Sequence, residues 1–329
     1  MNTTQSSVAA LVDAALAAAI RAPSPHNTQP WRFEVGSRHV DLLLDRERVL
    51  PIADPDAREA RLACGAALLN LRLALAVAGR TARVELLPDH NRPDLLATVW
   101  IGARREPGQD QRTLAEAIVR RASNRRPFAD RPVVPRQRHT LTRAAATEGA
   151  RLILLERPDE LSTFAALLRR ADSLQAEDPA FQSELLQWVA EHAGRADGVP
   201  RTAGGPRPLT GDVLAIRGYP TGSAPARPFE QDPLVAVLAM AGDTPLDQVH
   251  AGQAMQRVLL AATVEGLSVS FVSQPMEIAA TRVGLRDLVG GRAHPQTVLR
   301  IGHGYAVPQT PRRPVDQVTT VVEDREPKV

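Results

Sequence analysis

The sequence RAPSPHNTQPWRFEV, residues 21–35, is the most informative stretch of the chain. Prolines at positions 23, 25 and 30 exclude a regular helix and restrict the backbone. Five side chains that can form hydrogen bonds lie between them, and residues 31–35 then alternate as a β-strand does. A rigid polar loop before a strand suits a planar polar cofactor. A proline-rich turn with an asparagine in the left-handed region is the alternative.

Hydrophobic spacing predicts helices and strands on both sides of this loop. Helices are expected over 6–21, 56–78, 112–121, 135–147, 159–175, 179–192 and 246–265, and strands over 31–35, 39–44, 82–87, 97–102, 151–156, 268–272 and 297–301. Residues 194–233 are rich in glycine and proline and too long for an ordinary connection, so they predict a lid or binding loop. The Pro/Arg-rich tail 308–329 is expected to be extended.

The pattern of elements repeats along the chain. Glycine or proline recurs 187 residues later, without a gap, at three pairs of positions: Gly65 and Gly252, Gly79 and Gly266, Pro88 and Pro275. Glycine at a helix end and proline after a strand have fixed geometric roles, so the coincidence favours a duplication over two unrelated α/β units. We expect a first half over 1–110 and a second half over 111–329, with the lid insertion at 194–233.

Composition limits the possible functions. The chain has 329 residues, of which 43% are hydrophobic and 23% charged, as in soluble globular proteins. No apolar run is read as a membrane span, and no secretion signal is recognised at the N-terminus. The single cysteine, Cys64, excludes an intrachain disulfide, thiolate zinc sites and iron–sulfur clusters, and it fits a reducing compartment. A cytoplasmic protein without a metal site is therefore expected.

Charge and motifs exclude further classes. Lys328 is the only lysine, so a Lys-containing phosphate loop and a Schiff-base lysine are unavailable. The net charge is +3, but the sequence has no basic tract interleaved with aromatic residues, and this argues against nucleic-acid binding. The glycine fingerprint of dinucleotide-binding folds, the zinc-protease motif and the hydrolase nucleophile elbow do not occur.

The motif Pro23-Ser24-x-x-Asn27-x-Gln29-Pro30-Trp31-x-Phe33 resembles the flavin-contacting loop of the FMN-dependent nitroreductase family. With the other motifs it resembles the family's Acg-type branch, in which two nitroreductase-like halves are fused, over residues 5–318. The resemblance implies an α+β fold with two pseudo-symmetric halves, each holding a central, mainly antiparallel sheet flanked by helices. It also implies a monomer that copies internally the nitroreductase dimer, whose interface binds FMN.

Two arginine motifs resemble the family's phosphate-binding residues. Arg121-x-Ser123-x-Arg125 is similar to one of them, and Arg312-Arg313 to the second basic clamp. Guanidinium and hydroxyl groups suit the dianionic phosphate of FMN. Surface arginines in an arginine-rich protein are the alternative interpretation of these residues.

The resemblance assigns five residues of the loop to the isoalloxazine ring: Pro23, Ser24, Pro25, His26 and Asn27. His26 contacts either the flavin or the rest of the loop, and Gln29 either contacts the flavin or braces the loop. The resemblance also assigns Ser273-Gln274 to the flavin site, where the family places backbone against N5 and the ring face. The family often has Glu-Gly or Gly-Gly there, a difference that bears on ring access and redox tuning. Residues 144–149 replace the loop in the second half, so one FMN per chain is expected.

The resemblance implies an oxidoreductase that passes hydride from NAD(P)H through FMN N5 to a nitroaromatic, quinone or other conjugated acceptor, without a side-chain nucleophile. A flavin-sequestering or storage protein, whose lid blocks nicotinamide access, is the main alternative. The second alternative is a protein that only binds a partner and in which these motifs are remnants. Arg217, Tyr219 and Arg227 in the lid are expected to be solvated rather than to bind an anion.

Overall fold

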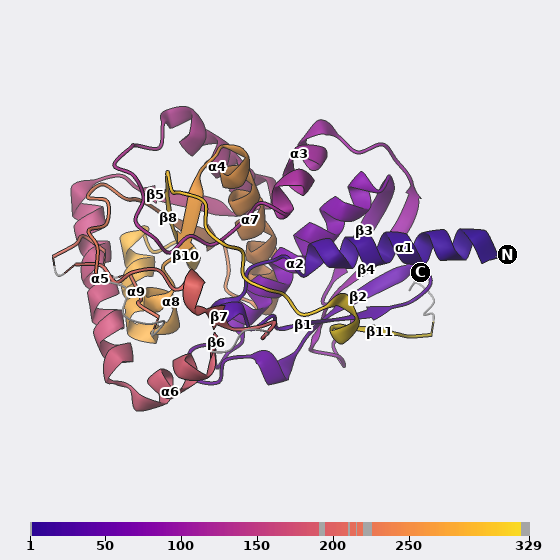
Figure 1. Cartoon of the computed structure of the whole chain (residues 1–329), viewed down its shortest axis with the longest axis horizontal. Coiled ribbons are helices and arrows are strands. Elements are labelled where there is room, and N and C mark those ends of the chain that lie inside the picture. The colour runs from indigo at the N-terminus through magenta and orange to yellow at the C-terminus, as the bar shows by residue number, and fades with distance from the viewer. Residues whose placement is uncertain (1, 191–194, 210, 215, 220–225, 324–329) are drawn as a thin grey trace.

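The computed structural model describes residues 2–190, 195–209, 211–214, 216–219 and 226–323. Two β-sheets with their own outer helices lie on either side of a central helix pair, α2 (Arg58–Val77) and α7 (Pro245–Val264) (Figure 1). The described segments nearest the two ends of the chain, α1 (Asn2–Ala19) and β11 (Thr319–Val321), both lie at the first sheet. The centre of the protein is therefore built from elements far apart in the sequence.

The first sheet has the strand order β11–β1–β2–β4–β3. Its strands are β1 (Trp31–Val35), β2 (His39–Leu44), β3 (Arg80–Leu86), β4 (Leu95–Arg104) and β11 (Thr319–Val321). Neighbours pair antiparallel, except that β11 runs parallel to β1. Part of the tail, expected to be only extended, therefore completes this sheet from the other end of the chain.

The second sheet has the order β5–β8–β10–β9, all antiparallel. Its strands are β5 (Arg151–Leu155), β8 (Leu234–Met240), β9 (Ser268–Phe271) and β10 (His294–Gly302). This repeats the order β1–β2–β4–β3 of the first sheet. The expected α+β fold of two pseudo-symmetric halves is confirmed. The sequence interpretation missed β8, because every residue of this strand is buried and its continuous apolar run gives no alternation.

The helices α2 and α7 cross where the repeat places its first pair of glycines. A Cβ on Gly65 would lie 2.2 Å from the carbonyl oxygen of Val249, and one on Gly252 would lie 2.1 Å from that of Leu62. Either Cβ would also lie 2.9 Å from the Cα of the other glycine. Only glycine permits this approach of the two backbones. Gly65 and Gly252 correspond in the repeat, and so do Leu62 and Val249, so the contacts of one glycine mirror those of the other. The crossing therefore lies on the axis that relates the two halves.

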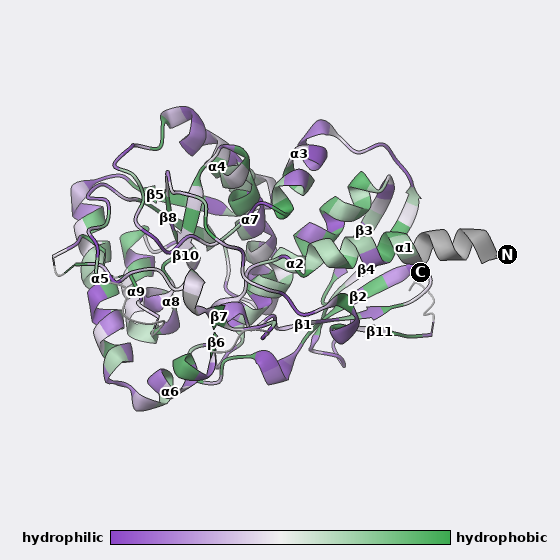
Figure 2. Cartoon of the chain, viewed as in Figure 1, coloured by the Kyte–Doolittle hydropathy of each residue, from purple (hydrophilic) through white to green (hydrophobic). Residues whose placement is uncertain are grey.

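The hydrophobic core surrounds this crossing. Figure 2 shows hydrophobic residues concentrated on the central helices, whereas the outer helix α5 (Pro158–Glu177) carries both kinds of residue. By length and composition α2 could span a membrane, which the sequence interpretation did not recognise. Most of that apolar stretch, 78%, is buried inside the protein, so α2 is a core helix of this fold.

The remaining helices cover the two sheets. They are α1 (Asn2–Ala19), α3 (Gln109–Ile118), α4 (Pro135–Thr147), α6 (Pro179–Gln187), α8 (Gln274–Glu277) and α9 (Ala279–Leu288). Helix α1 packs on α2, as α4 packs on α7, and α3 packs on both central helices. The proposed boundary at residue 110 falls in the first turn of α3, and the division there stays a prediction.

The expected helix over 179–192 is too long. Helix α6 ends at Gln187, and β6 (Val189–Ala190) then pairs in parallel with β7 (Val199–Pro200). The valine at 189 continues the apolar helical pattern, so no local signal marks the change to a strand. Residues 191 and 192 of this prediction lie outside the described residues, as do 194, 210, 215 and 220–225 of the predicted lid.

Candidate functional site

The loop between α1 and β1 has an unusual backbone. After Pro25 the chain makes one 3₁₀ turn, in which His26 has φ 45°, Asn27 has φ 58°, and Gln29 then has φ 56°. Positive φ costs about 1–3 kcal/mol at a residue other than glycine, so the surroundings must hold these three residues in place. Such strain is concentrated at functional sites, which makes this loop the first candidate.

Hydrogen bonds from distant segments hold the loop. The Nδ2 of Asn27 donates to the carbonyls of Gly198 and Pro311, each at 3.1 Å. Gln29 is fully buried; its Nε2 donates to the Ala196 carbonyl at 2.8 Å, and its Oε1 accepts from the Arg313 amide at 2.8 Å. Gln29 therefore braces the loop, the second of its two expected roles.

One end of the loop borders a cavity of about 550 Å³, here called the arginine cavity. Its lining comes from the loop, the segment after α3 and the segment after β10: Arg21, Pro23, Ser24, Asn27, Arg121, Ala122, Ser123, Arg125, Phe271, Pro308, Gln309, Thr310 and Arg312. This lining contains four arginines and no carboxylate. The two arginine motifs, almost 190 residues apart, thus meet at one place.

The arginines of this cavity have no carboxylate partner among the described residues. The carbonyl oxygen of Arg21 accepts from Nη2 of both Arg121 (3.4 Å) and Arg312 (3.3 Å), so the two guanidinium groups lie together. Burial, with Arg125 and Arg21 nearby, lowers the pKa of Arg121 to about 10. Burial, with Arg121 and Arg21 nearby, lowers the pKa of Arg312 to about 9. An anion in this cavity would relieve the repulsion between these cations.

Three polar atoms of the same residues are buried without a hydrogen-bond partner in the described part of the chain. They are Nε of Arg121, Nε of Arg312 and Oδ1 of Asn27. Buried polar atoms are normally paired, and an unpaired group costs about 1–3 kcal/mol. Two donors and one acceptor therefore remain available to a ligand that carries both an anionic group and hydroxyls.

A second cavity of about 740 Å³, the central cavity, lies on the other side of Pro23, Ser24, Arg125 and Phe271, which line both. Its other lining residues come from the loop, the central helices, the second sheet, α8 and the insertion: Pro25, His26, Glu59, Leu62, Ala63, Ile216, Arg217, Tyr219, Met255, Ser270, Ser273, Gln274, Glu277 and Thr297. Apolar and polar groups are mixed in this cavity, as in a site for a planar polar ligand.

The insertion closes over the central cavity through an ion pair. Nη2 of Arg217 lies 2.5 Å from Oε2 of Glu277 and 2.7 Å from Oε1 of Gln175. Burial acts in the opposite direction, but the Glu277 carboxylate raises the pKa of Arg217. The expectation that Arg217 is solvated is wrong, whereas Arg227 is exposed as expected.

His26 joins the loop to the same insertion. Its Nδ1 lies 3.2 Å from the Tyr219 hydroxyl, and Arg125 stacks over the Tyr219 ring at 4.9 Å. Burial, with Arg217 and Arg125 nearby, lowers the pKa of His26 well below its usual value, so the imidazole is neutral. The side chain thus packs the loop against the insertion and lines the central cavity, while its contact with the flavin stays a prediction.

Eleven of the thirteen site residues expected from the sequence line one cavity or both: Pro23, Ser24, Pro25, His26, Asn27, Arg121, Ser123, Arg125, Ser273, Gln274 and Arg312. Gln29 and Arg313 line neither. Arg313 instead reaches the Gln317 carbonyl at 2.8 Å and lies 3.9 Å from the Asp45 carboxylate. Adjacent arginines in the sequence therefore have different surroundings.

The sequence interpretation missed several residues that line the cavities. Arg21 directly precedes the loop and could have been included from its position. Glu59, in the first turn of α2, and Ser270, whose buried Oγ has no partner among the described residues, carry no motif. Hydrophobic spacing marks both segments only as a helix and a strand. Their part in the site depends on how the halves pack.

Sequence relatives identify the family. No model of a known protein family matches the chain. A Mycobacterium tuberculosis protein, provisionally named NAD(P)H nitroreductase Acg, is 32% identical over 315 residues, which cover 94% of this chain and 95% of that protein. A second, provisionally named NAD(P)H nitroreductase Rv3131, is 34% identical over 320 residues, covering 94% and 91%. The chain belongs to the nitroreductase family, in its Acg-type branch.

Solved structures of nitroreductases overlap with part of the chain. The FMN-bound nitroreductase of Desulfitobacterium hafniense DCB-2 has a TM-score of 0.42 and 13% identity, covering 64% of this chain and 98% of its own. The NADPH:FMN oxidoreductase of Vibrio harveyi, complexed with NAD+, has a TM-score of 0.40 and 15% identity, covering 66% and 79%. The assignment to the family comes from the sequence relatives.

Proposed function

We propose that this chain is an FMN-binding oxidoreductase of the nitroreductase type. It would transfer hydride from NAD(P)H, by way of FMN N5, to a nitroaromatic, a quinone or another conjugated acceptor. The observation that carries the proposal is the arginine cavity, four arginines without a carboxylate, next to a larger cavity beneath the strained loop. Both M. tuberculosis relatives are named as NAD(P)H nitroreductases, which agrees with this reaction.

The residues present fit FMN. Arg121 and Arg312 would hold its phosphate, with Arg21, Arg125 and the Ser123 hydroxyl beside them, because charged donors bind phosphate oxygens most strongly. The unpaired Oδ1 of Asn27 would accept from a ribityl hydroxyl. Bound FMN would supply two-electron hydride chemistry at N5, which side chains cannot provide.

The central cavity would hold the ring and the acceptor. Pro23, Ser24, Pro25 and His26 would cover one side of the ring, and Ser270, Ser273 and Gln274 would approach it from the second sheet and α8. The insertion, through Arg217 and Tyr219, would exclude water. In this arrangement the chain binds and orients the reactants and limits access to them.

We further propose one FMN per chain and a monomer in solution. Residues 148–150 form a short turn between α4 and β5, where the loop of a reciprocal site would have to lie. Both halves of a nitroreductase dimer are already present in one chain, so no second copy is needed to build the site.

Anaerobic mixing tests this function. The purified protein should be yellow, with one FMN per chain, and excess NADH or NADPH should bleach the flavin band rapidly. A stable yellow colour that only dithionite bleaches would overturn hydride transfer and favour flavin storage. Colourless protein that takes up no added FMN would overturn the cofactor and favour an interaction protein.

A further inference from the structure

Glu59 is the one acidic side chain of the central cavity that has no hydrogen bond or ion pair among the described residues. It lies in the first turn of α2, where Asp54 accepts hydrogen bonds from the amides of Glu59 (3.1 Å) and Ala60 (2.9 Å). The Glu59 backbone is thus fixed at the helix start, while its carboxyl group faces the cavity.

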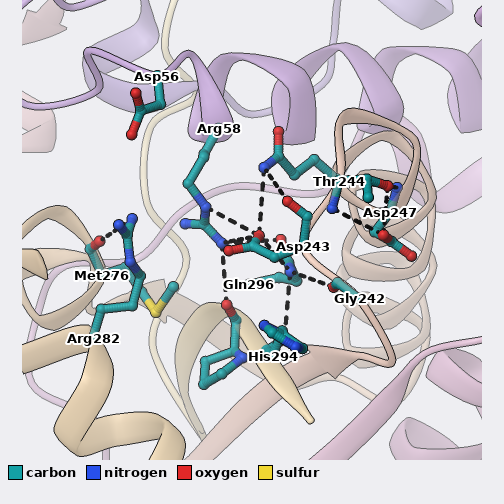
Figure 3. A network of polar contacts seen from close by, with 12 residues as sticks. Asp56, Arg58, Gly242, Asp243, Thr244, Asp247, Met276, Arg282, His294 and Gln296 are labelled. Atoms are coloured by element: carbon teal, nitrogen blue, oxygen red, sulfur yellow. Dashed lines mark hydrogen bonds and ion pairs between the residues drawn. The ribbon is translucent and has the colours of Figure 1, made fainter.

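The neighbouring cations are engaged elsewhere. Arg58 points towards Asp243 and Gln296, at the start of α7 and on β10, as Figure 3 shows; its Nη2 lies 3.0 Å from Asp243 Oδ1 and 3.1 Å from Gln296 Oε1. Arg217 is bound to Glu277 at 2.5 Å. Glu59, which is half-buried, therefore lacks the close cation that would keep its carboxylate ionised.

Other titratable groups of the cavity cannot supply a proton readily. His26 is neutral and its Nδ1 is hydrogen-bonded to Tyr219, and the carboxylate of Glu277 is held by Arg217 and by Gln175 at 2.5 Å. Guanidinium groups do not act as acids near neutral pH. The Tyr219 hydroxyl is engaged with His26, so Glu59 is the carboxyl group of the cavity that remains as a proton donor.

Burial, together with the Glu277 and Asp54 carboxylates, raises the pKa of Glu59 well above its usual value. The charged and titratable groups around it are Asp54, Arg58, Arg217 and Glu277, with His26, Arg125 and Tyr219 also on the cavity. The raised pKa means that the protonated form persists at a pH where an ordinary glutamate is ionised.

We propose that Glu59 is the proton donor to the electron acceptor. This inference rests on the proposed function. In the two-electron reduction of a quinone, the quinone takes up one hydride and one proton and becomes a hydroquinone. The bound cofactor would supply the hydride, and the Glu59 carboxyl would give the proton of the new O–H bond. The resulting carboxylate takes a proton from water before the next turnover. The acceptor class is thus one with an oxygen that gains a proton on reduction.

The experiment compares two acceptors in single turnover. Holoprotein reduced with dithionite is mixed with 1,4-benzoquinone, which takes up protons, or with ferricyanide, which takes electrons alone. In Glu59→Gln we expect reoxidation by benzoquinone to slow by about 10²-fold, the usual contribution of a general acid. The rate of reoxidation by ferricyanide should stay within about twofold of the wild-type rate, because this acceptor takes up no proton and the substitution alters packing only slightly. The exposed Glu47→Gln is the matched control, with no expected change.

Two further readouts separate proton donation from a structural role. The benzoquinone rate of the wild type should fall as pH rises through the pKa of Glu59, because the acid form is lost, and the Glu59→Gln rate should be flat. In the apoprotein, the infrared band of a protonated carboxyl group should persist above the usual glutamate range and disappear in Glu59→Gln but not in Glu47→Gln.

The outcomes are distinguishable. If the flavin binds and is reduced but Glu59→Gln matches the wild type with both acceptors, this proposal is wrong and the proposed function stands. Equal slowing with both acceptors would also overturn it, because electron transfer itself would then be impaired. If no flavin binds, both proposals are wrong.

Discussion

The two halves of this chain share a frame and differ in their connections. The first half joins α1 to β1 through residues 20–30, whereas the second joins α4 to β5 through residues 148–150. The second half places residues 156–233 between β5 and β8, where the first has only residues 36–38 between β1 and β2. Each half is thus elaborated where the other has a short turn.

The site uses both elaborations at once. The loop of the first half and the insertion of the second meet through His26 and Tyr219, beside the shared helices α2 and α7. The comparison teaches that the duplicated elements supply the packed frame, and that the loop and the insertion, which are not duplicated, supply many of the residues that line the cavities. The predictions below test each side of this division.

The largest effect is expected at the helix crossing. Gly65→Ala and Gly252→Ala should each destabilise the protein by at least about 2 kcal/mol, because the new Cβ meets backbone on both sides. The two losses should be similar, since the positions correspond in the repeat. Denaturant midpoints at constant m-value measure them.

Gly284→Ala, in helix α9, is the matched control for the crossing. Its Cβ would meet the Leu167 side chain at 2.8 Å, and the end of a leucine can move. We expect it to be near neutral, because alanine also favours the helix by about 1 kcal/mol. If Gly65→Ala or Gly252→Ala lowers the free energy of unfolding no more than Gly284→Ala does, the interpretation that α2 and α7 cross closely on the axis relating the halves is wrong.

An intermediate effect is expected in the arginine cavity. Arg121→Ala or Arg312→Ala should weaken FMN binding by roughly 1–3 kcal/mol, because each removes a charged donor to the phosphate. This corresponds to a factor of about 5–150 in Kd, measurable by flavin fluorescence. Arg313→Ala, next in sequence but outside both cavities, should leave Kd unchanged. Equal losses at Arg312 and Arg313 would contradict the assignment.

The smallest effect is expected where the insertion meets the loop. Tyr219→Phe removes the hydroxyl that contacts His26 at 3.2 Å and should cost about 0.5–1.5 kcal/mol of stability in thermal melts. A loosened insertion should also let NADH bleach the flavin faster. The only other tyrosine, Tyr305, is 82% exposed, so Tyr305→Phe is the control and should change neither quantity. If Tyr219→Phe does not change the rate at which NADH bleaches the flavin, the insertion does not control the access of NADH to the flavin.

Elements with a periodic pattern were predicted well. The strands over 31–35 and 39–44 and the helix over 135–147 have the expected bounds, because Pro30, the Gly36-Ser37 turn and Pro135 mark where they begin. β8 escaped because a fully buried strand has no polar face, and β6 because it continues a helical pattern. β11 escaped because three residues gain strand geometry only by pairing with β1, almost 290 positions earlier.

The chain's own sequence determined the rigid loop, the spaced arginines and the repeated glycines, because proline, charge and the absence of a Cβ act locally and can be read at single positions. Tertiary structure alone decided that Arg312 lines the arginine cavity while Arg313 does not, and that Glu59 has no partner among the described residues. These outcomes depend on burial and on distances between segments far apart in the chain. No local pattern records such distances, since they arise only when the two halves pack together.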